Sequence, residues 1–204
     1  MKTFHHRSST LVAGALALAA LVPVAAPAQD LHPSRRPSPL GIARINLDDA
    51  YVRVIYGRPY KRDRDNIFGT AESKALVPFG ERWRTGANEA SEITTTRDLV
   101  IAGQKLPAGT YSLFTTPGAD KWKVHFNSTL GLSGTGYFHA EEQRFEPVEL
   151  GPTDVVTVEV PVKALEEKDE VDQLTISFAK AEGGAEMVLA WIRTEVRVPF
   201  QVAK

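Results

Sequence analysis

The sequence predicts an all-β protein, folded as a single-domain antiparallel β-sandwich, with the jelly roll as one form that such a sandwich can take. Three features of the chain indicate this class. About ten short segments are rich in β-branched and aromatic residues, and several of them alternate between apolar and polar side chains. Glycine and proline turn signals separate these segments at near-regular spacing. Almost no stretch repeats apolar residues at the helical period.

Residues 1–28 are typical of a secretory signal peptide. Lys2 and Arg7 make the start positive, residues 11–26 are apolar, and Ala26-Pro27-Ala28 is a cleavage site of small residues. The alternative is a retained membrane anchor, but this apolar run of about 16 residues is shorter than the ~20 that span a bilayer. We therefore expect an exported protein, periplasmic or extracellular, that begins at Gln29 and has no integral membrane segment.

Length and composition then exclude several classes. Without the leader the chain has about 176 residues and a net charge of about −3, compared with −1 for all 204 residues. This length fits one domain, and the mixed charge gives no electrostatic reason to bind nucleic acid or anionic lipid. The absence of cysteine excludes disulfides and thiolate metal sites. Nucleotide-binding glycine loops and the Gly-x-Ser-x-Gly motif are also absent, so we predict no cofactor.

The mature chain divides into an arm and a domain. Residues 29–40 are polar, contain three prolines, and predict a proline-rich tether or extended arm. Residues 41–204 then form the predicted β-sandwich domain. Within it, residues 61–66 alternate basic and acidic side chains and predict a solvated loop, whereas residues 71–76 predict one short helical turn.

The strands of the domain follow from the β-rich segments. They are predicted at residues 51–56, 92–96, 99–102, 110–115, 122–126, 144–150, 155–160, 174–178, 187–192 and 195–202. Pro117-Gly118 and Gly183-Gly184 predict hairpin turns. Pro199 predicts a break in the last strand, at an edge or a bend, because proline cannot donate a hydrogen bond to a neighbouring strand.

One segment, residues 76–90, shows neither the helical nor the strand period of apolar residues. It gathers a tryptophan, two arginines, an asparagine and two glutamates around two glycines. Such a segment is typical of a shaped loop that either holds a site or fixes the core.

Several strings, in order, resemble the secreted bacterial proteins catalogued as domain of unknown function 2911. They are Tyr56-Gly57-Arg58-Pro59, Ile67-Phe68-Gly69, Leu76-Val77-Pro78-Phe79-Gly80, Trp83-Arg84-Thr85-Gly86-Ala87-Asn88-Glu89-Ala90 and Leu106-Pro107-Ala108-Gly109-Thr110-Tyr111-Ser112-Leu113. The resemblance extends from about Pro39 to Val202. It implies an exported, mostly β protein, and it assigns no activity and no catalytic residues. Residues 140–152 look like an addition to the family pattern.

The first candidate site is a ligand site in the irregular loop. Arg84, Asn88 and Glu89 form its centre, and its neighbours are Arg58, Tyr56 and Trp83. A guanidinium can hold a carboxylate or phosphate by two hydrogen bonds, and the amide and carboxylate beside it can recognise hydroxyls. The structural alternative pairs Arg84 with Glu89 or a buried carbonyl, which would fix the loop to the sandwich.

The second candidate is His125 with Asn127. Alternation along residues 122–126 places Trp122 and Phe126 toward the core and puts His125 on the opposite, polar face of the strand. A histidine there can act as an acid or a base near neutral pH, and the alternative is an ordinary surface histidine.

Two further groups complete the candidates. His139 with Glu141 and Glu142 has metal-binding atoms but no recognised ligand spacing, so we predict no metal site. The larger aromatic residues could stack on sugar rings, but strand positions indicate that two of them, Trp122 and Trp191, belong to the core. This aromatic set is Trp83, Tyr111, Trp122, Tyr137 and Trp191.

Three functions remain open. The leading hypothesis is a binding module for a small polar or anionic molecule, or for cell-envelope glycan. The second is a hydrolase or lyase with Glu89 as general base and Arg84 as electrostatic stabiliser, with His125 as a further candidate. The third is a structural or partner-binding protein in which the loop only fixes the core.

Overall fold

The computed structural model describes residues 35–204 of the chain. The predicted leader and the first part of the predicted tether lie outside the described residues. Strands account for 58% of the residues and helical turns for 4%, which confirms the all-β prediction. No helix in the described part is long and apolar enough to cross a membrane.

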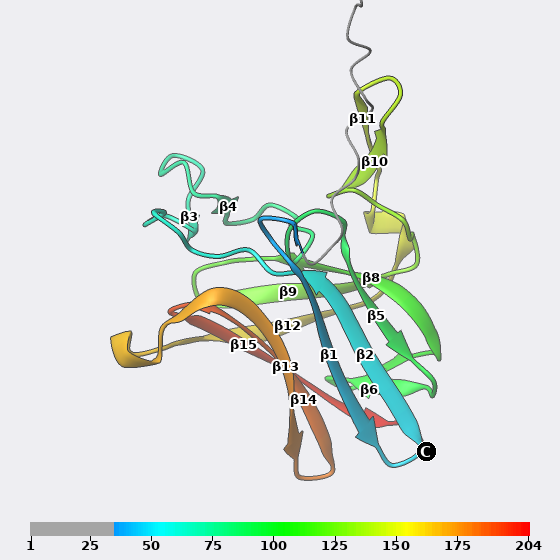
Figure 1. Cartoon of the computed structure of the whole chain (residues 1–204). Coiled ribbons are helices and arrows are strands. Elements are labelled where there is room, and N and C mark those ends of the chain that lie inside the picture. The colour runs from blue at the N-terminus through cyan, green and yellow to red at the C-terminus, as the bar shows by residue number, and fades with distance from the viewer. Residues whose placement is uncertain (1–34) are drawn as a thin grey trace, which may run out of the picture. The chain divides into compact units, whose positions relative to one another are not determined.

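Fifteen strands make up the domain, and Figure 1 shows their arrangement. Their bounds are β1 (Leu40–Leu47), β2 (Ala50–Gly57), β3 (Phe68–Gly69), β4 (Val77–Pro78), β5 (Ser91–Thr95), β6 (Leu99–Ile101), β7 (Gln104–Leu106), β8 (Gly109–Thr116), β9 (Lys121–Asn127), β10 (Gly136–His139), β11 (Arg144–Pro147), β12 (Asp154–Ala164), β13 (Val171–Ala181), β14 (Gly184–Ile192) and β15 (Thr194–Val202).

The sandwich consists of two antiparallel layers that share one long strand. The first layer has the order β1-β2-β5-β8-β9-β12, and the second has the order β12-β15-β14-β13, with the hairpin β6–β7 added beside β15. Residues 154–161 of β12 pair with β9, whereas residues 162–164 pair with β15. The strand therefore passes from one layer to the other, and the chain folds as an antiparallel β-sandwich.

One core fills the space between the layers. Buried apolar side chains from both layers belong to a single cluster, among them Val54, Leu113, Phe126, Ile176 and Leu189. Burial of such side chains from water is the main driving force for folding. Trp122 and Trp191 are only 3% and 1% exposed, which confirms that both belong to the core.

An aromatic cluster connects this core to the irregular loop. The ring of Phe68 lies 5.0 Å from Trp122, 5.8 Å from Trp191 and 5.9 Å from Trp83, in edge-on contacts. Trp83 also stacks on Trp191, with ring centroids 6.0 Å apart. Aromatic pairs at these separations contribute beyond their buried area. The cluster holds Trp83, and hence its neighbours in sequence, at a fixed place over the second layer.

The end of β2 and the residues that follow it close one side of the sandwich along the free edge of β13. The hydroxyl of Tyr56 donates to the carbonyl of Ile176 at 3.2 Å and accepts from its amide at 2.8 Å. Arg58 Nε donates to the carbonyl of Leu174, whose amide donates to the carbonyl of Pro59. These bonds satisfy backbone groups that an edge strand would otherwise leave unpaired.

Some predicted elements differ from the structure. The last strand runs unbroken through Pro199, which lies where β15 changes its second neighbour from β12 to β6 and needs no N–H donor. The strand predicted at residues 144–150 ends at Pro147 and pairs with β10 in a separate hairpin, β10–β11. The sequence reasoning missed β1 because its buried positions, Gly41 and Ala43, are small while Ile42 between them is 60% exposed.

The contacts of Tyr56 lead to a first prediction. Tyr56→Phe should lower the free energy of unfolding by about 1–3 kcal/mol, because the buried amide and carbonyl of Ile176 both lose their partner. Urea unfolding followed by fluorescence measures this. The matched control is Tyr137→Phe at an exposed position, where we expect a change within about 0.5 kcal/mol. Equal effects from the two substitutions would contradict the role assigned to Tyr56.

Candidate functional site

The loop after β4 is held in a fixed conformation by its own backbone. Trp83 exchanges two backbone hydrogen bonds with Thr115 of β8, at 2.7 and 2.9 Å, and its indole donates to the carbonyl of Gly86. Thr85 is fully buried with a left-handed φ of 54°, which is rare for a β-branched residue. Strained residues of this kind persist only where the surroundings fix them. The side chains beside Trp83 are therefore presented in a defined way.

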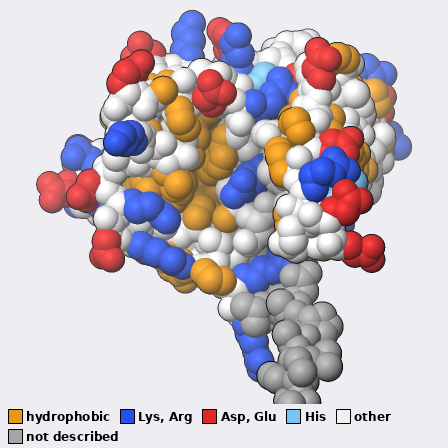
Figure 2. Space-filling view, turned by 90° about the horizontal axis from the view of Figure 1, so that it is seen from above, with side chains coloured by type: hydrophobic (Ala, Val, Ile, Leu, Met, Phe, Trp, Pro, Cys, Tyr) orange, Lys and Arg blue, Asp and Glu red, His pale blue; other side chains and the backbone are white. Residues whose placement is uncertain are grey.

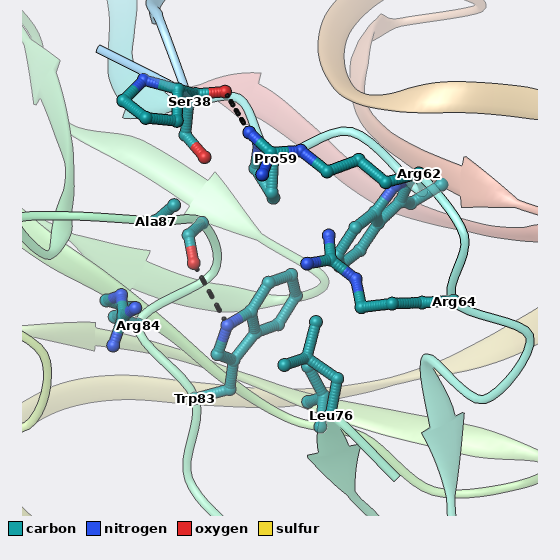
Figure 3. Close-up of a pocket in the computed structure, with 12 residues that line it drawn as sticks. Ser38, Pro59, Arg62, Arg64, Leu76, Trp83, Arg84 and Ala87 are labelled. Atoms are coloured by element: carbon teal, nitrogen blue, oxygen red, sulfur yellow. Dashed lines mark hydrogen bonds between the residues drawn. The ribbon is translucent and has the colours of Figure 1, made fainter.

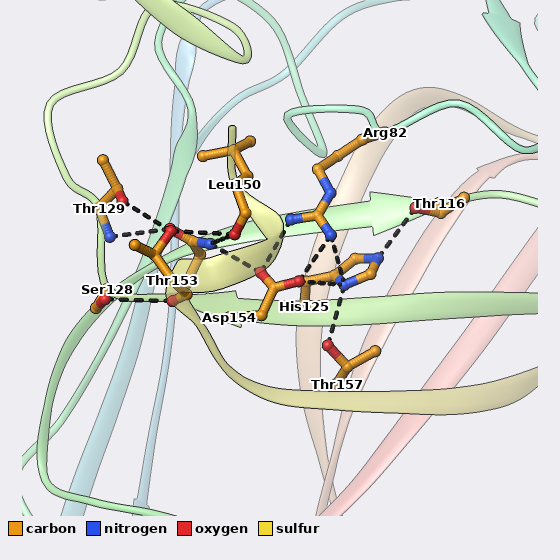
Figure 4. A network of polar contacts seen from close by, with 10 residues as sticks. Arg82, Thr116, His125, Ser128, Thr129, Leu150, Thr153, Asp154 and Thr157 are labelled. Atoms are coloured by element: carbon orange, nitrogen blue, oxygen red, sulfur yellow. Dashed lines mark hydrogen bonds and ion pairs between the residues drawn. The ribbon is translucent and has the colours of Figure 1, made fainter. Parts of the chain in front are cut away.

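Arg82, just before Trp83, is fully paired. Its guanidinium donates two hydrogen bonds to Asp154, at 2.9 and 2.7 Å, as Figure 4 shows. Asn127 donates to the same carboxylate at 2.8 Å. Burial would raise the pKa of Asp154, but the hydrogen bonds from Arg82 and Asn127 and the charge of Arg82 outweigh it, so this pKa lies below its ordinary value. The ion pair fastens the loop to the start of β12.

His125 lies inside this network and is not a surface residue. It is 5% exposed and Asn127 is 0% exposed, so the prediction of an open polar face at these positions was wrong. Nδ1 of His125 lies 3.1 Å from Asp154 Oδ2, and Nε2 lies 3.0 Å from the hydroxyl of Thr116. Burial lowers the pKa of His125, and the charge of Arg82 lowers it further. The lowered pKa favours the neutral imidazole near pH 7, and the buried contacts of both ring nitrogens give His125 a structural role.

The face of the first layer that carries His125 is covered by two loops, one with Arg82 and one with Leu132. Phe114, Leu132, Leu150 and Ala90 form a second, smaller apolar cluster on this side of the first layer. Arg82 also lies over the Phe114 ring, 5.9 Å from its centroid. These contacts join residues far apart in sequence, and the alternation of a single strand carries no sign of them.

Arg84 differs from Arg82 in having no acidic partner. Its side chain makes no hydrogen bond or ion pair within residues 35–204, and its Nε is buried without an acceptor. Burial lowers the pKa of the Arg84 guanidinium. The ion pair with Glu89 that the structural alternative expects is not formed. Glu89 instead binds Arg36 through both carboxylate oxygens, at 2.6 and 2.7 Å.

A cavity of about 260 Å³ lies on one side of Arg84, and we call it the arginine cavity. Figure 3 shows its interior, and Figure 2 shows a hollow with an apolar floor and a basic rim on this face of the molecule. Its lining residues are Pro37, Ser38, Pro59, Arg62, Arg64, Leu76, Val77, Trp83, Arg84, Gly86, Ala87 and Trp191. Three arginines line the cavity, and none of its described lining residues is acidic.

A shallower cavity of about 480 Å³ lies on the other side, and we call it the hydroxyl cavity. Ser133, Thr135 and Asn88 provide hydroxyl and amide groups, and Phe145 provides an exposed ring. Arg82, Trp83, Arg84 and Gly134 complete the lining. Arg84 therefore borders both cavities, which is consistent with a charge presented to a ligand.

The other predicted site residues separate into two groups. Trp83 and Asn88 lie beside Arg84, although the Asn88 amide also donates to the carbonyl of Ser38 at 3.0 Å. Glu89 borders a different cavity, together with Arg36 and Tyr56. Tyr56 and Arg58 hold the edge of β13 and do not contact Arg84 by any hydrogen bond. The structure thus brings together only part of the predicted set.

The described part of the predicted tether, residues 35–39, lies against the domain. The carbonyls of Pro37, Ser38 and Pro39 accept hydrogen bonds from Arg62, Asn88 and Arg58 respectively. This short segment forms one wall of the arginine cavity.

The remaining candidates lie elsewhere. His139 Nε2 lies 3.0 Å from Glu146 Oε2, and among the described residues no hydrogen bond joins His139 to Glu141 or Glu142. The part of the chain that the structure describes contains no cluster of three or more potential metal ligands among its His, Asp and Glu side chains. Tyr111 is buried and Tyr137 is 39% exposed on the β10–β11 hairpin.

Comparison with known proteins adds a family. A family model described as Protein of unknown function (DUF2911) matches residues 38–200. The chain belongs to the DUF2911 family. No curated protein and no solved structure matches it significantly. The matched range contains all three arginines of the arginine cavity, but the description assigns no activity, so any function of this DUF2911 protein must be argued from its geometry.

Arg62 and Arg64 line the arginine cavity, and sequence reasoning did not select them as candidates. Their alternation with acidic residues is the usual pattern of a solvated loop, yet both face the arginine cavity. Arg82 and Asp154 were missed as a pair as well. Arg82 and Arg84 flank the same tryptophan, so nothing local distinguishes the paired arginine from the unpaired one.

The ion pair gives a second prediction. Arg82→Ala should lower the free energy of unfolding by about 3 kcal/mol or more, because Asp154 is left partly buried without its main partner. Urea unfolding measures the loss. Arg144→Ala, which breaks only exposed ion pairs on the β10–β11 hairpin, is the control and should change stability little. A small effect of Arg82→Ala would show that the pair does not fasten the loop.

The lowered pKa of His125 gives a third prediction. Because the folded pKa lies below the ordinary value of about 6.5, the unfolded chain binds the proton more readily, and stability should fall as pH drops below about 6.5. The slope is at most ~1.4 kcal/mol per pH unit for one proton. Urea unfolding from pH 7.5 to 5 should show this decline in wild type and a flatter profile in His125→Gln. The contribution of Asp154 is lost only at lower pH, since its pKa is depressed. Parallel profiles would contradict the assignment.

Proposed function

We propose that this protein binds a small anionic molecule through Arg84. The observation that carries the proposal is that Arg84 is partly buried, has no acidic partner among the described residues, and borders two cavities. Removing a charge from water is unfavourable unless the protein or a ligand compensates it. A bound anion would supply the compensation that the described protein groups do not.

Carboxylate and phosphate groups match this site best. A guanidinium presents paired N–H donors to two oxygens of such a group, and these charge-assisted hydrogen bonds are about twice as strong as neutral ones. Partial exclusion of water around Arg84 strengthens the attraction further. If the protein is exported, as its leader predicts, the ligand would be met outside the cytoplasm.

The other two hypotheses receive less support from the geometry. An enzyme with Glu89 as base would need that carboxylate beside Arg84, whereas Glu89 is paired with Arg36 and borders another cavity. A loop that only fixes the core would need Arg84 to be paired, and Arg82 already performs that fixing role through Asp154. A glycan would have to use the hydroxyl cavity, where Ser133 and Thr135 lie.

Arg84→Gln tests the proposal and is the fourth prediction. The free energy of unfolding should stay within about 0.5 kcal/mol or rise, because an uncompensated charge is removed, as is common at functional sites. Binding of inorganic phosphate, measured by isothermal titration calorimetry at low salt, should weaken by ~tenfold or more, because the two charge-assisted hydrogen bonds from Arg84 are removed.

The matched control is Arg53→Gln. Arg53 also has a buried Nε without a partner, but it lies on β2 and lines neither cavity. This variant should bind phosphate like wild type. A loss of more than about 2 kcal/mol of stability in Arg84→Gln, with phosphate binding retained, would instead favour the structural alternative.

A further inference from the structure

The arginine cavity contains a second arginine of the same kind as Arg84. Three side-chain nitrogens in residues 35–204 are buried without a hydrogen-bond partner, on Arg53, Arg64 and Arg84, and two of these three arginines line this one cavity. Arg64 donates one hydrogen bond to the carbonyl of Tyr60, and Arg62 donates one to that of Pro37 at 3.1 Å. Each arginine has five N–H donors, so both retain donors for a ligand.

The cations stand at two ends of an apolar floor. In Figure 3, Arg84 lies on one side of the Trp83 indole, whereas Arg62 and Arg64 lie on the other side. Leu76, which is 49% exposed, lies beside the indole, and Trp191 also lines the cavity. A single carboxylate on Arg84 would therefore leave Arg62 and Arg64 unused.

The size of the cavity limits what can lie across this floor. A volume of about 260 Å³ equals that of about nine water molecules at ~30 Å³ each. This space suits one ring with its substituents rather than a chain of sugars. The flat face of an indole is best covered by another flat apolar group, since aromatic faces stack with an offset.

We propose that the ligand of this cavity is a flat, single-ring acid with an anionic group at each end of the ring. One group binds Arg84, the other binds Arg64 with Arg62, and the ring lies over Trp83 and against Leu76. Aromatic dicarboxylates and aryl phosphates that carry a second acid share this chemistry. The inference rests on the proposed function, because it names the class of anion that Arg84 holds.

Calorimetry of the purified protein with four probes tests the inference. Terephthalate has the ring and both acids, benzoate has one acid, adipate has two acids without a ring, and inorganic phosphate has neither ring nor second end. Terephthalate should bind at least ~tenfold more tightly than each of the other three, since it alone gains from both ends and from the buried ring.

Two variants show which side chains provide the additional affinity for terephthalate. Arg64→Gln should lower the affinity for terephthalate to near that for benzoate, because Arg84 then holds one acid and the second acid has lost its main partner. Leu76→Gln, at a half-exposed position where folding is not at risk, should weaken both ring acids by ~threefold or more and leave adipate and phosphate unchanged. Arg53→Gln should change none of these affinities.

The outcomes separate the two proposals. If phosphate binding depends on Arg84 but terephthalate binds no more tightly than benzoate or adipate, the inference is overturned and the proposed function stands. Tighter binding of neutral or acidic sugars than of any ring acid would overturn it in favour of the hydroxyl cavity. If no anion binds to wild type, both proposals fail.

Discussion

Asp154 and Arg82 form the contact on which the candidate site depends. The carboxylate stands at the start of the strand that joins the two layers, and it receives both arms of the guanidinium. Because Arg82 is two residues from Arg84, the ion pair that holds Arg82 also holds the backbone from which the Arg84 side chain extends. The charge of Arg82 is satisfied in forming this contact, whereas Arg84 has no acidic partner among residues 35–204. One arginine therefore serves the fold, and we propose that the other serves a ligand.

The buried hydrogen-bond network around this ion pair explains why the His125 face of the first layer is covered and not open to solvent. His125, Asn127 and Thr116 supply donors and acceptors between strands, and the small apolar cluster around Phe114 excludes water beside them. Polar groups are tolerated inside a protein when they are hydrogen-bonded, and such networks favour one arrangement over others. The two loops that carry Arg82 and Leu132 are thus held to the sheet by polar and apolar contacts together.

The sequence was sufficient for the fold class because alternation and turn residues are local signals. Trp122 and Trp191 were assigned to the core on that basis. The same rule failed for β1, where Gly41 and Ala43 face inward, and for His125, whose face is covered by distant loops. For the site, composition identified the loop and Arg84. It could not distinguish Arg84 from Arg82, and it could not show that Arg62 and Arg64 line a cavity, because pairing and cavity walls depend on contacts between distant segments.

The wall that residues 35–39 provide has a practical consequence for anyone who prepares this protein. Pro37 and Ser38 line the arginine cavity, and Asn88 and Arg62 hold that segment in place. If the leader is removed before Gln29, as the sequence predicts, an affinity tag at the new amino terminus would join the chain eight residues before Pro37. A histidine-rich or acidic tag there would compete for the basic rim. A carboxyl-terminal tag after Lys204 avoids that interference, since neither cavity beside Arg84 includes the last residues of the chain.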